Sequence, residues 1–110
     1  LLWLNKLGAK TCCISDKYLD RPNHLNLLNL KLEKKNELLV DLGNSINKKK
    51  ISNFLIKKRP KIIFHLAAQS LVKKSYSNPI YTWQTNAVGT LNVLESLKNL
   101  KKKMCCSTYN

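Results

Sequence analysis

Acidic residues and glycine are both scarce in this sequence. Its 110 residues include six Asp and Glu against 20 Lys and Arg, and only three glycines. No glycine-rich loop is present, so these residues contain no phosphate-binding loop of the kind that opens many dinucleotide-binding domains. Long hydrophobic runs are missing as well. The apolar start, residues 1–4, is too short for a membrane span and lacks the flanks of a secretory signal, so a membrane protein is not expected.

The surplus of positive charge, +14 at pH 7, is one feature of proteins that bind nucleic acid. The lysines, however, are spread over predicted helix ends and turns and do not form one stripe. Only Arg21 and Arg59 are arginine, the residue best suited to base edges and phosphates. Nucleic acid is therefore not the expected partner. A small basic module for anions or nucleic acid remains the alternative.

The four cysteines form two adjacent pairs, Cys12-Cys13 and Cys105-Cys106. Adjacent cysteines lack the spacing of a zinc knuckle, and neighbours in a strand point to opposite faces. No metal site is expected. Reduced thiols used as small apolar residues are typical of a cytoplasmic protein.

The hydrophobic pattern predicts helices and strands in alternation along the chain. Helices are predicted at residues 1–7, 23–32, 47–58 and 78–98, and strands at residues 9–15, 37–42, 61–66 and, at the tail, 104–110. Gly8 suits the end of the first helix, and Asn78-Pro79 suits the start of the last. This order indicates an α/β fold, with a parallel sheet that carries helices on both faces. Nothing in the sequence divides it into domains.

Three predicted strand ends are candidates for binding, because ligands of open parallel sheets lie outside the carboxyl ends of the strands. Asp16 follows the first strand, where a carboxylate can accept both hydroxyls of a ribose or, equally, cap a turn. Residues 41–44 follow the second, where Asp41 or Asn44 would read the amine of adenine. Residues 66–69 follow the third, where small side chains let a dinucleotide lie against the backbone.

His65 and Asn86 are two further polar residues that we considered as candidates for a functional role. His65 lies inside an apolar strand, so we interpret it as a core histidine with a hydrogen-bonded ring and not as a base. Asn86 and Gly89 are both unfavourable inside a helix, and together they indicate a functional or close-packing reason. Ser75 and Tyr76 are candidates for contact with a sugar.

The second half of the chain resembles the extended short-chain dehydrogenase/reductase family, in particular its nucleotide-sugar dehydratases. The residues that carry the resemblance are Phe64-His65-Leu66-Ala67-Ala68-Gln69, Leu71-Val72-Lys73-Lys74-Ser75-Tyr76, Asn78-Pro79, Thr85-Asn86, Gly89-Thr90 and Leu94-Glu95. The run from Ala67 to Tyr76 is similar to the branch that acts on CDP-glucose. Weaker similarity extends back to Leu1.

The resemblance implies a Rossmann fold that binds NAD. The family oxidises the sugar at C4 by hydride transfer to NAD⁺, eliminates water across C5 and C6, and returns the hydride to C6. CDP-glucose would thus become CDP-4-keto-6-deoxyglucose. A nucleotide sugar is the implied partner, and the parent enzyme is expected to be a homo-oligomer.

Carried over residue by residue, the resemblance assigns each candidate a place along the cofactor. Ala67, Ala68 and Gln69 would line it, and Asn86 would order the loop beside its nicotinamide half. Asn44 falls where the family has an Asp beside adenine, with Asp41 as the alternative. Asp16 is one step from the expected ribose position.

Some parts of the family pattern have no counterpart in these residues. The first strand and the glycine-rich loop are expected before Leu1, and the later Tyr-x-x-x-Lys pair and the sugar-binding domain are absent. Ser107-Thr108-Tyr109-Asn110 stands where a catalytic Thr-Asp-Lys segment is expected. We therefore expect residues 1–110 to be a partial NAD-binding domain, with no catalytic residues and no dehydratase activity alone.

Overall fold

The computed structural model describes residues 1–17 and 33–106, and it leaves the side chains of residue 99 and residues 101–106 undescribed. The chain divides into two compact units, Leu1–Val40 and Asp41–Asn110. Each is described by itself below. The predicted helix at residues 23–32 lies outside the described residues.

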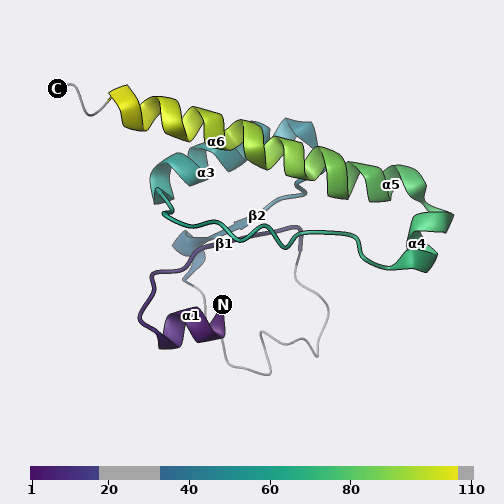
Figure 1. The fold of residues 1–110 in the computed structure, drawn as a ribbon, viewed down its shortest axis with the longest axis horizontal. Coiled ribbons are helices and arrows are strands. Elements are labelled where there is room, and N and C mark those ends of the chain that lie inside the picture. Colours follow the sequence, from purple (N-terminus) through teal and green to yellow (C-terminus); the bar gives the residue numbers. More distant parts are fainter. Residues whose placement is uncertain (18–32, 107–110) are drawn as a thin grey trace. The chain divides into compact units, whose positions relative to one another are not determined.

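The first unit contains a two-stranded parallel sheet. Helix α1 (Leu2–Lys6) ends at Gly8, whose φ of 79° is a left-handed conformation that glycine adopts without strain. Strands β1 (Cys13–Ser15) and β2 (Glu37–Leu39) then pair in parallel, with Ile14 opposite Leu38 (Figure 1). The 3₁₀ turn η1 (Lys34–Asn36) leads into β2. The predicted α/β class with parallel strands is thus confirmed, although both strands are shorter than predicted.

The second unit is helical among its described residues. Its elements are the 3₁₀ turn η2 (Ser45–Asn47), α3 (Lys48–Lys58), α4 (Val72–Ser77), α5 (Pro79–Trp83), the π-helical turn η3 (Gln84–Val88) and α6 (Gly89–Cys106). The predicted start at Asn78-Pro79 is confirmed: the Asn78 side chain accepts a hydrogen bond from the Tyr81 amide at 3.1 Å. From α5 to α6 the chain forms one continuous helical run, with α3 alongside α6 (Figure 1).

The core of the second unit lies between α3 and α6. Ile51 is completely buried, and Leu55, Val93 and Leu100 are nearly so. Ser96 is also fully buried, and its hydroxyl donates to the Asn92 carbonyl at 2.7 Å, which satisfies it inside the apolar contact. This contact is what holds the long helical run in place.

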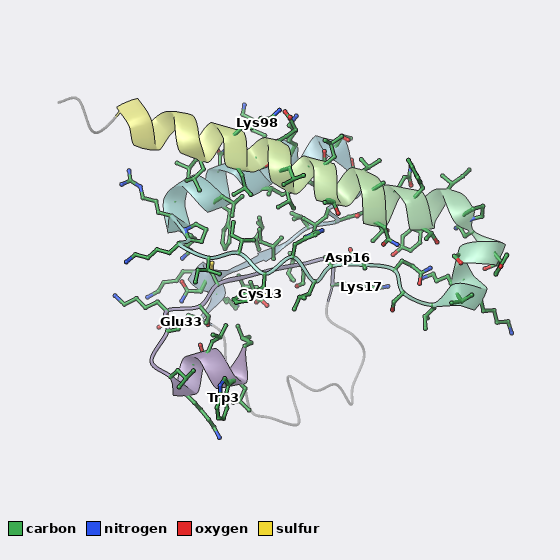
Figure 2. The ribbon with its side chains drawn as sticks, viewed as in Figure 1. Trp3, Cys13, Asp16, Lys17, Glu33 and Lys98 are labelled. Carbon is green, nitrogen blue, oxygen red and sulfur yellow. The ribbon has the colours of Figure 1, made fainter. Side chains whose placement is uncertain are left out.

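Glu95 links the two core helices at the surface. Its carboxylate contacts Lys98 at 2.6 Å on its own helix and Lys48 of α3 at 3.5 Å. The hydrogen bond from Lys98 and the charges of both lysines lower the pKa of the Glu95 carboxyl. Figure 2 shows Lys98 on α6. Such exposed pairs contribute little to stability, so the apolar contact dominates.

Two strand predictions are wrong. Residues 61–66 form no strand, because a strand needs a neighbour to take its backbone hydrogen bonds and none of the described residues supplies one. His65, predicted in the core, is accordingly exposed. At the other end, α6 continues to Cys106, so residues 104–106 are helical and do not begin a strand; the rest of that predicted strand, residues 107–110, lies outside the described residues. Within the described part of the chain, no helix is long and apolar enough to cross a membrane.

Candidate functional site

Asn86 is the central residue of the candidate site. It lies in the π-helical turn η3, and its side chain forms hydrogen bonds with both the amide and the carbonyl of Gln69. Oδ1 of Asn86 accepts from the Gln69 amide at 2.7 Å, and Nδ2 donates to the Gln69 carbonyl at 3.1 Å. One side-chain amide thus takes both hydrogen bonds that a neighbouring strand would supply. π-Helical turns often occur at functional sites, and this one carries the residue that fixes the loop.

Gln69 is fixed through its side chain as well. Its Oε1 accepts from the Leu71 amide at 2.7 Å, while its Nε2 donates to the Leu71 carbonyl at 3.2 Å and to Thr82 Oγ1 at 3.1 Å. Ala67 and Ala68, which precede this anchored residue, are both exposed. At Ala67 and Ala68 the backbone is uncovered by any large side chain, and Gln69 after them is held by hydrogen bonds, which suits a flat ligand lying on the backbone.

His65 is tied to the same helical run through Thr90. The Thr90 hydroxyl donates to the Asn86 carbonyl at 2.6 Å, and His65 Nε2 lies 2.9 Å from Thr90 Oγ1. Since a hydroxyl has one proton and Thr90 directs it to Asn86, Nε2 of His65 must be the donor in the second bond. The predicted hydrogen-bonded ring is therefore confirmed, and Nε2 is not available as a base.

The turn at residues 41–44 packs against the same helical segment, between Gln84 and Asn92. Asp41 Oδ1 accepts from the Gly43 amide at 2.8 Å, and Asn44 Oδ1 accepts from the Ile46 amide at 3.0 Å. Both predicted adenine-reading residues thus serve the turn itself. The buried Asn92 of α6 donates its side-chain amide to the Leu42 carbonyl at 2.7 Å. Sequence reasoning missed Asn92, although it carries the same signal as Asn86, an asparagine inside a helix.

Two glycines bring this turn close to the helical run. A Cβ atom at Gly43 would lie 2.9 Å from the Gln84 carbonyl oxygen, and one at Gly89 would lie 3.3 Å from Leu42 Cβ. The sequence predicted a functional or close-packing reason for Asn86 and Gly89 inside the helix. For Gly89 the structure confirms close packing, against Leu42. The turn at residues 41–44 and the loop at residues 66–69 therefore both contact the segment from Gln84 to Asn92.

Replacing Gly43 with alanine is expected to lower the free energy of unfolding by about 1–3 kcal/mol, because the new Cβ overlaps backbone atoms of Gln84 that cannot rotate away. The matched change Gly89→Ala should cost less, since its contact is looser and alanine gains up to about 1 kcal/mol in a helix. Urea unfolding of both variants is the measurement. Equal costs at the two positions would contradict the close approach at Gly43.

An open hollow of about 400 Å³ borders the Asn86 anchor. It is lined by Ser75, Pro79, Thr82, Trp83, Asn86 and Ala87. Two predicted site residues, Ser75 and Asn86, therefore meet here, and Thr82 joins them to Gln69. The Ser75 hydroxyl itself donates to the Val72 carbonyl at 2.6 Å. Tyr76 is 84% exposed on the same short helix, α4, outside this lining.

Asp16 belongs to the first unit. It is exposed and directly follows the last residue of β1, as predicted (Figure 2). Nearby, burial, followed by the charges of Glu37 and Cys12, raises the pKa of the Cys13 thiol, which keeps it neutral and unreactive. Among the residues that the structure describes, no three His, Cys, Asp or Glu side chains gather where they would hold a metal ion.

Comparison with known proteins gives consistent matches. The family model of GDP-mannose 4,6 dehydratase matches residues 3–110. CDP-glucose 4,6-dehydratase of Salmonella typhimurium is 35% identical over 90% of this chain and 26% of its own length. UDP-glucose 4-epimerase of Mycoplasma genitalium is 30% identical over 76% of this chain and 23% of its own length.

A shorter match has a higher identity: GDP-mannose 4,6 dehydratase 2 of Caenorhabditis elegans is 53% identical over 34% of this chain and 10% of its own length. No solved structure matches the chain significantly. The chain thus spans about a quarter of the length of the first two relatives.

Proposed function

Because the chain belongs to the GDP-mannose 4,6 dehydratase family of nucleotide-sugar enzymes, we propose that it forms part of the cofactor-binding domain of a 4,6-dehydratase. The main observation in support is the pair of hydrogen bonds between the Asn86 side chain and the backbone of Gln69. These hydrogen bonds hold Gln69 directly after Ala67 and Ala68, whose small side chains leave the backbone open to a ligand. The parent enzyme would use NAD, which supplies a hydride acceptor and donor when bound.

The residues present fit the nicotinamide side of such a cofactor. Ala67 and Ala68 expose backbone without bulk, so a flat ring can approach it closely. Asn86 and Gln69 hold that backbone still, which reduces the ordering cost of binding. Ser75, on the lining of the adjacent hollow, and the exposed Tyr76 would face the sugar.

The remaining candidates would hold the adenosine half of the cofactor. Asn44, or Asp41 in its place, would accept from the adenine amine while it also holds its own turn. An ionised carboxylate accepts several hydrogen bonds, so the turn contact leaves Asp41 capacity for a ligand. Asp16 would accept the ribose hydroxyls from its exposed position after β1.

CDP-glucose is the substrate that we propose for the parent enzyme. The support is the 35% identity with a CDP-glucose 4,6-dehydratase over 90% of this chain. The similarity to a UDP-glucose 4-epimerase over 76% of the chain favours the alternative, another nucleotide sugar handled by the same family. None of the candidate residues above is assigned to the base of the nucleotide sugar, so the anchor at Asn86 would serve either substrate.

Incubation with NAD⁺ and CDP-glucose tests the proposal. The purified chain alone is expected to form no 4-keto sugar, because the family's Tyr-x-x-x-Lys pair is not among its residues and His65 Nε2 is already a donor to Thr90. A full-length CDP-glucose 4,6-dehydratase serves as the positive control under the same conditions. Formation of the 4-keto product by the 110-residue chain would contradict the proposal that it is only part of the domain.

A further inference from the structure

The hollow beside Asn86 contains an aromatic surface that the described residues of the second unit leave uncovered. All of its lining residues are described and belong to that unit. Three of them follow one another every four residues along the helical run and form its apolar side: Pro79, Trp83 and Ala87. Trp83 is 69% exposed. A large flat side chain therefore borders a volume of about 400 Å³, within the usual range of about 300–1,000 Å³ for ligand pockets.

The polar side of the hollow consists of groups that can still accept hydrogen bonds. The hydroxyls of Ser75 and Thr82 donate to backbone carbonyls of their own helical segments, at 2.6 and 3.1 Å. Thr82 accepts one hydrogen bond, from Gln69, so each hydroxyl oxygen keeps a lone pair for a ligand. Asn86 Oδ1 accepts from the Gln69 amide, and an amide oxygen can accept twice. This side of the hollow therefore suits a ligand that brings hydroxyl donors.

Charge excludes a phosphate from the hollow. None of the residues that line it is charged. Lys74, the cation next to Ser75 in the sequence, has its ammonium 4.6 Å from the ring centre of Tyr81, which is not part of the lining. A phosphate brings negative charge and hydrogen-bond acceptors, so it would meet other acceptors without a compensating cation. A neutral ring with several hydroxyls fits better than the pyrophosphate of a nucleotide.

The hollow adjoins the backbone to which we assign the nicotinamide half of the cofactor. Thr82 and Asn86 line it, and both bind Gln69, at 3.1 and 2.7 Å, directly after Ala67 and Ala68. Reacting groups have to approach one another to about 3–3.5 Å. A sugar that reacts with a cofactor at Ala67 and Ala68 therefore has to lie beside this backbone, and the hollow satisfies that requirement.

We propose that Trp83 is a platform on which the hexose of the nucleotide sugar stacks, while Ser75, Thr82 and Asn86 accept hydrogen bonds from its hydroxyls. The inference rests on the proposed function, because its ligand is the sugar of the proposed substrate, and it adds a binding residue to that site. The face of a pyranose carries C–H groups with a small positive partial charge. The face of an indole is negative, so the two faces attract each other.

Nuclear magnetic resonance of the indole N–H groups tests this contact in the full 110-residue chain. The sequence has two tryptophans, Trp3 and Trp83, so the variants Trp3→Phe and Trp83→Phe assign the two signals. CDP-glucose is expected to shift the Trp83 signal, and CDP, which lacks the hexose, should leave it unchanged. Trp3 is the matched control, because it is 71% exposed and outside the lining of the hollow. Its signal should respond to neither ligand.

Replacing Trp83 with alanine measures how much the platform contributes. Titration of CDP-glucose, followed by the side-chain amide signal of Asn86, should show about tenfold weaker binding to Trp83→Ala than to the unaltered chain. Trp3→Ala should bind like the unaltered chain. Because Trp83 is exposed, Trp83→Ala is expected to fold, and an unchanged midpoint of urea unfolding checks this. Equal affinities of the two variants would overturn the platform.

Titration with NAD⁺ separates this inference from the proposed function. NAD⁺ is expected to shift the backbone amides of Ala67, Ala68 and Gln69. That response, with a Trp83 signal that CDP-glucose leaves unchanged, would overturn the platform alone. A Trp83 response to CDP-glucose, with no response to NAD⁺, would uphold the platform and contradict the proposed function. A Trp83 signal that CDP shifts as much as CDP-glucose does, or that only NAD⁺ shifts, would overturn the platform, and no response to any ligand would contradict both.

Discussion

Replacing Ile51 with alanine is expected to lower the free energy of unfolding by about 2–4 kcal/mol. Ile51 is completely buried in the contact between α3 and α6, so the change removes apolar contacts and leaves a cavity. Small domains are stable by only about 5–15 kcal/mol, which makes this a large share of the total. Urea unfolding followed by circular dichroism measures the effect.

Two control substitutions show whether the loss of stability at Ile51 comes from its burial or only from the removal of side-chain atoms. Ile51→Val removes one methyl group and should cost about 1 kcal/mol. Ile46→Ala removes the same atoms as Ile51→Ala from a side chain that is 84% exposed, and it should be nearly neutral. Similar losses for Ile51→Ala and Ile46→Ala would contradict a core between α3 and α6.

Replacing Asn86 with alanine is expected to cost about 1–2 kcal/mol and to release the loop at residues 66–69. Two hydrogen bonds to Gln69 are lost, at about 0.5–1.5 kcal/mol each, and the better helix propensity of alanine offsets roughly 0.5 kcal/mol of this. Asn86→Asp keeps the acceptor for the Gln69 amide but loses the donor to its carbonyl, so it should also destabilise. Thermal unfolding checks that both variants are less stable than the unaltered chain.

Asn53→Ala is the control for Asn86. Asn53 is exposed on α3, so its replacement by alanine should be neutral or slightly stabilising through helix propensity alone. A stabilising Asn86→Ala, with Asn53→Ala behaving alike, would mean that the bonds to Gln69 contribute nothing. In that case Asn86 would not be the residue that orders the loop.

Elements with local signals were predictable from the sequence. The helix over α3 has an apolar face at Ile51 and Leu55 and ends before Pro60, and the long helical run begins at the local signal Asn78-Pro79. Gly8 ends α1 for a reason that involves only its own backbone. Each of these signals acts within a few residues, so no knowledge of the rest of the fold is needed.

Features that depend on distant residues were not predictable in the same way. The apolar run at residues 61–66 predicts a strand, but a strand also requires a neighbour, and pattern alone does not say whether one is present. Asn86 was found because asparagine is unfavourable inside a helix; its partner Gln69, seventeen positions earlier, was not evident as a partner. Asn92 and its contact with Leu42, fifty positions away, were missed for the same reason.

Hydrogen exchange of individual backbone amides tests the central claim most directly, namely that Asn86 holds Gln69 at the end of a segment without backbone hydrogen bonds among the described residues. In the free chain, the amide of Gln69 should be protected, because it donates to Asn86 at 2.7 Å, while the amides of residues 62–66 should exchange at the rate of unstructured chain. Protection along residues 62–66 together with an unprotected Gln69 would contradict the account.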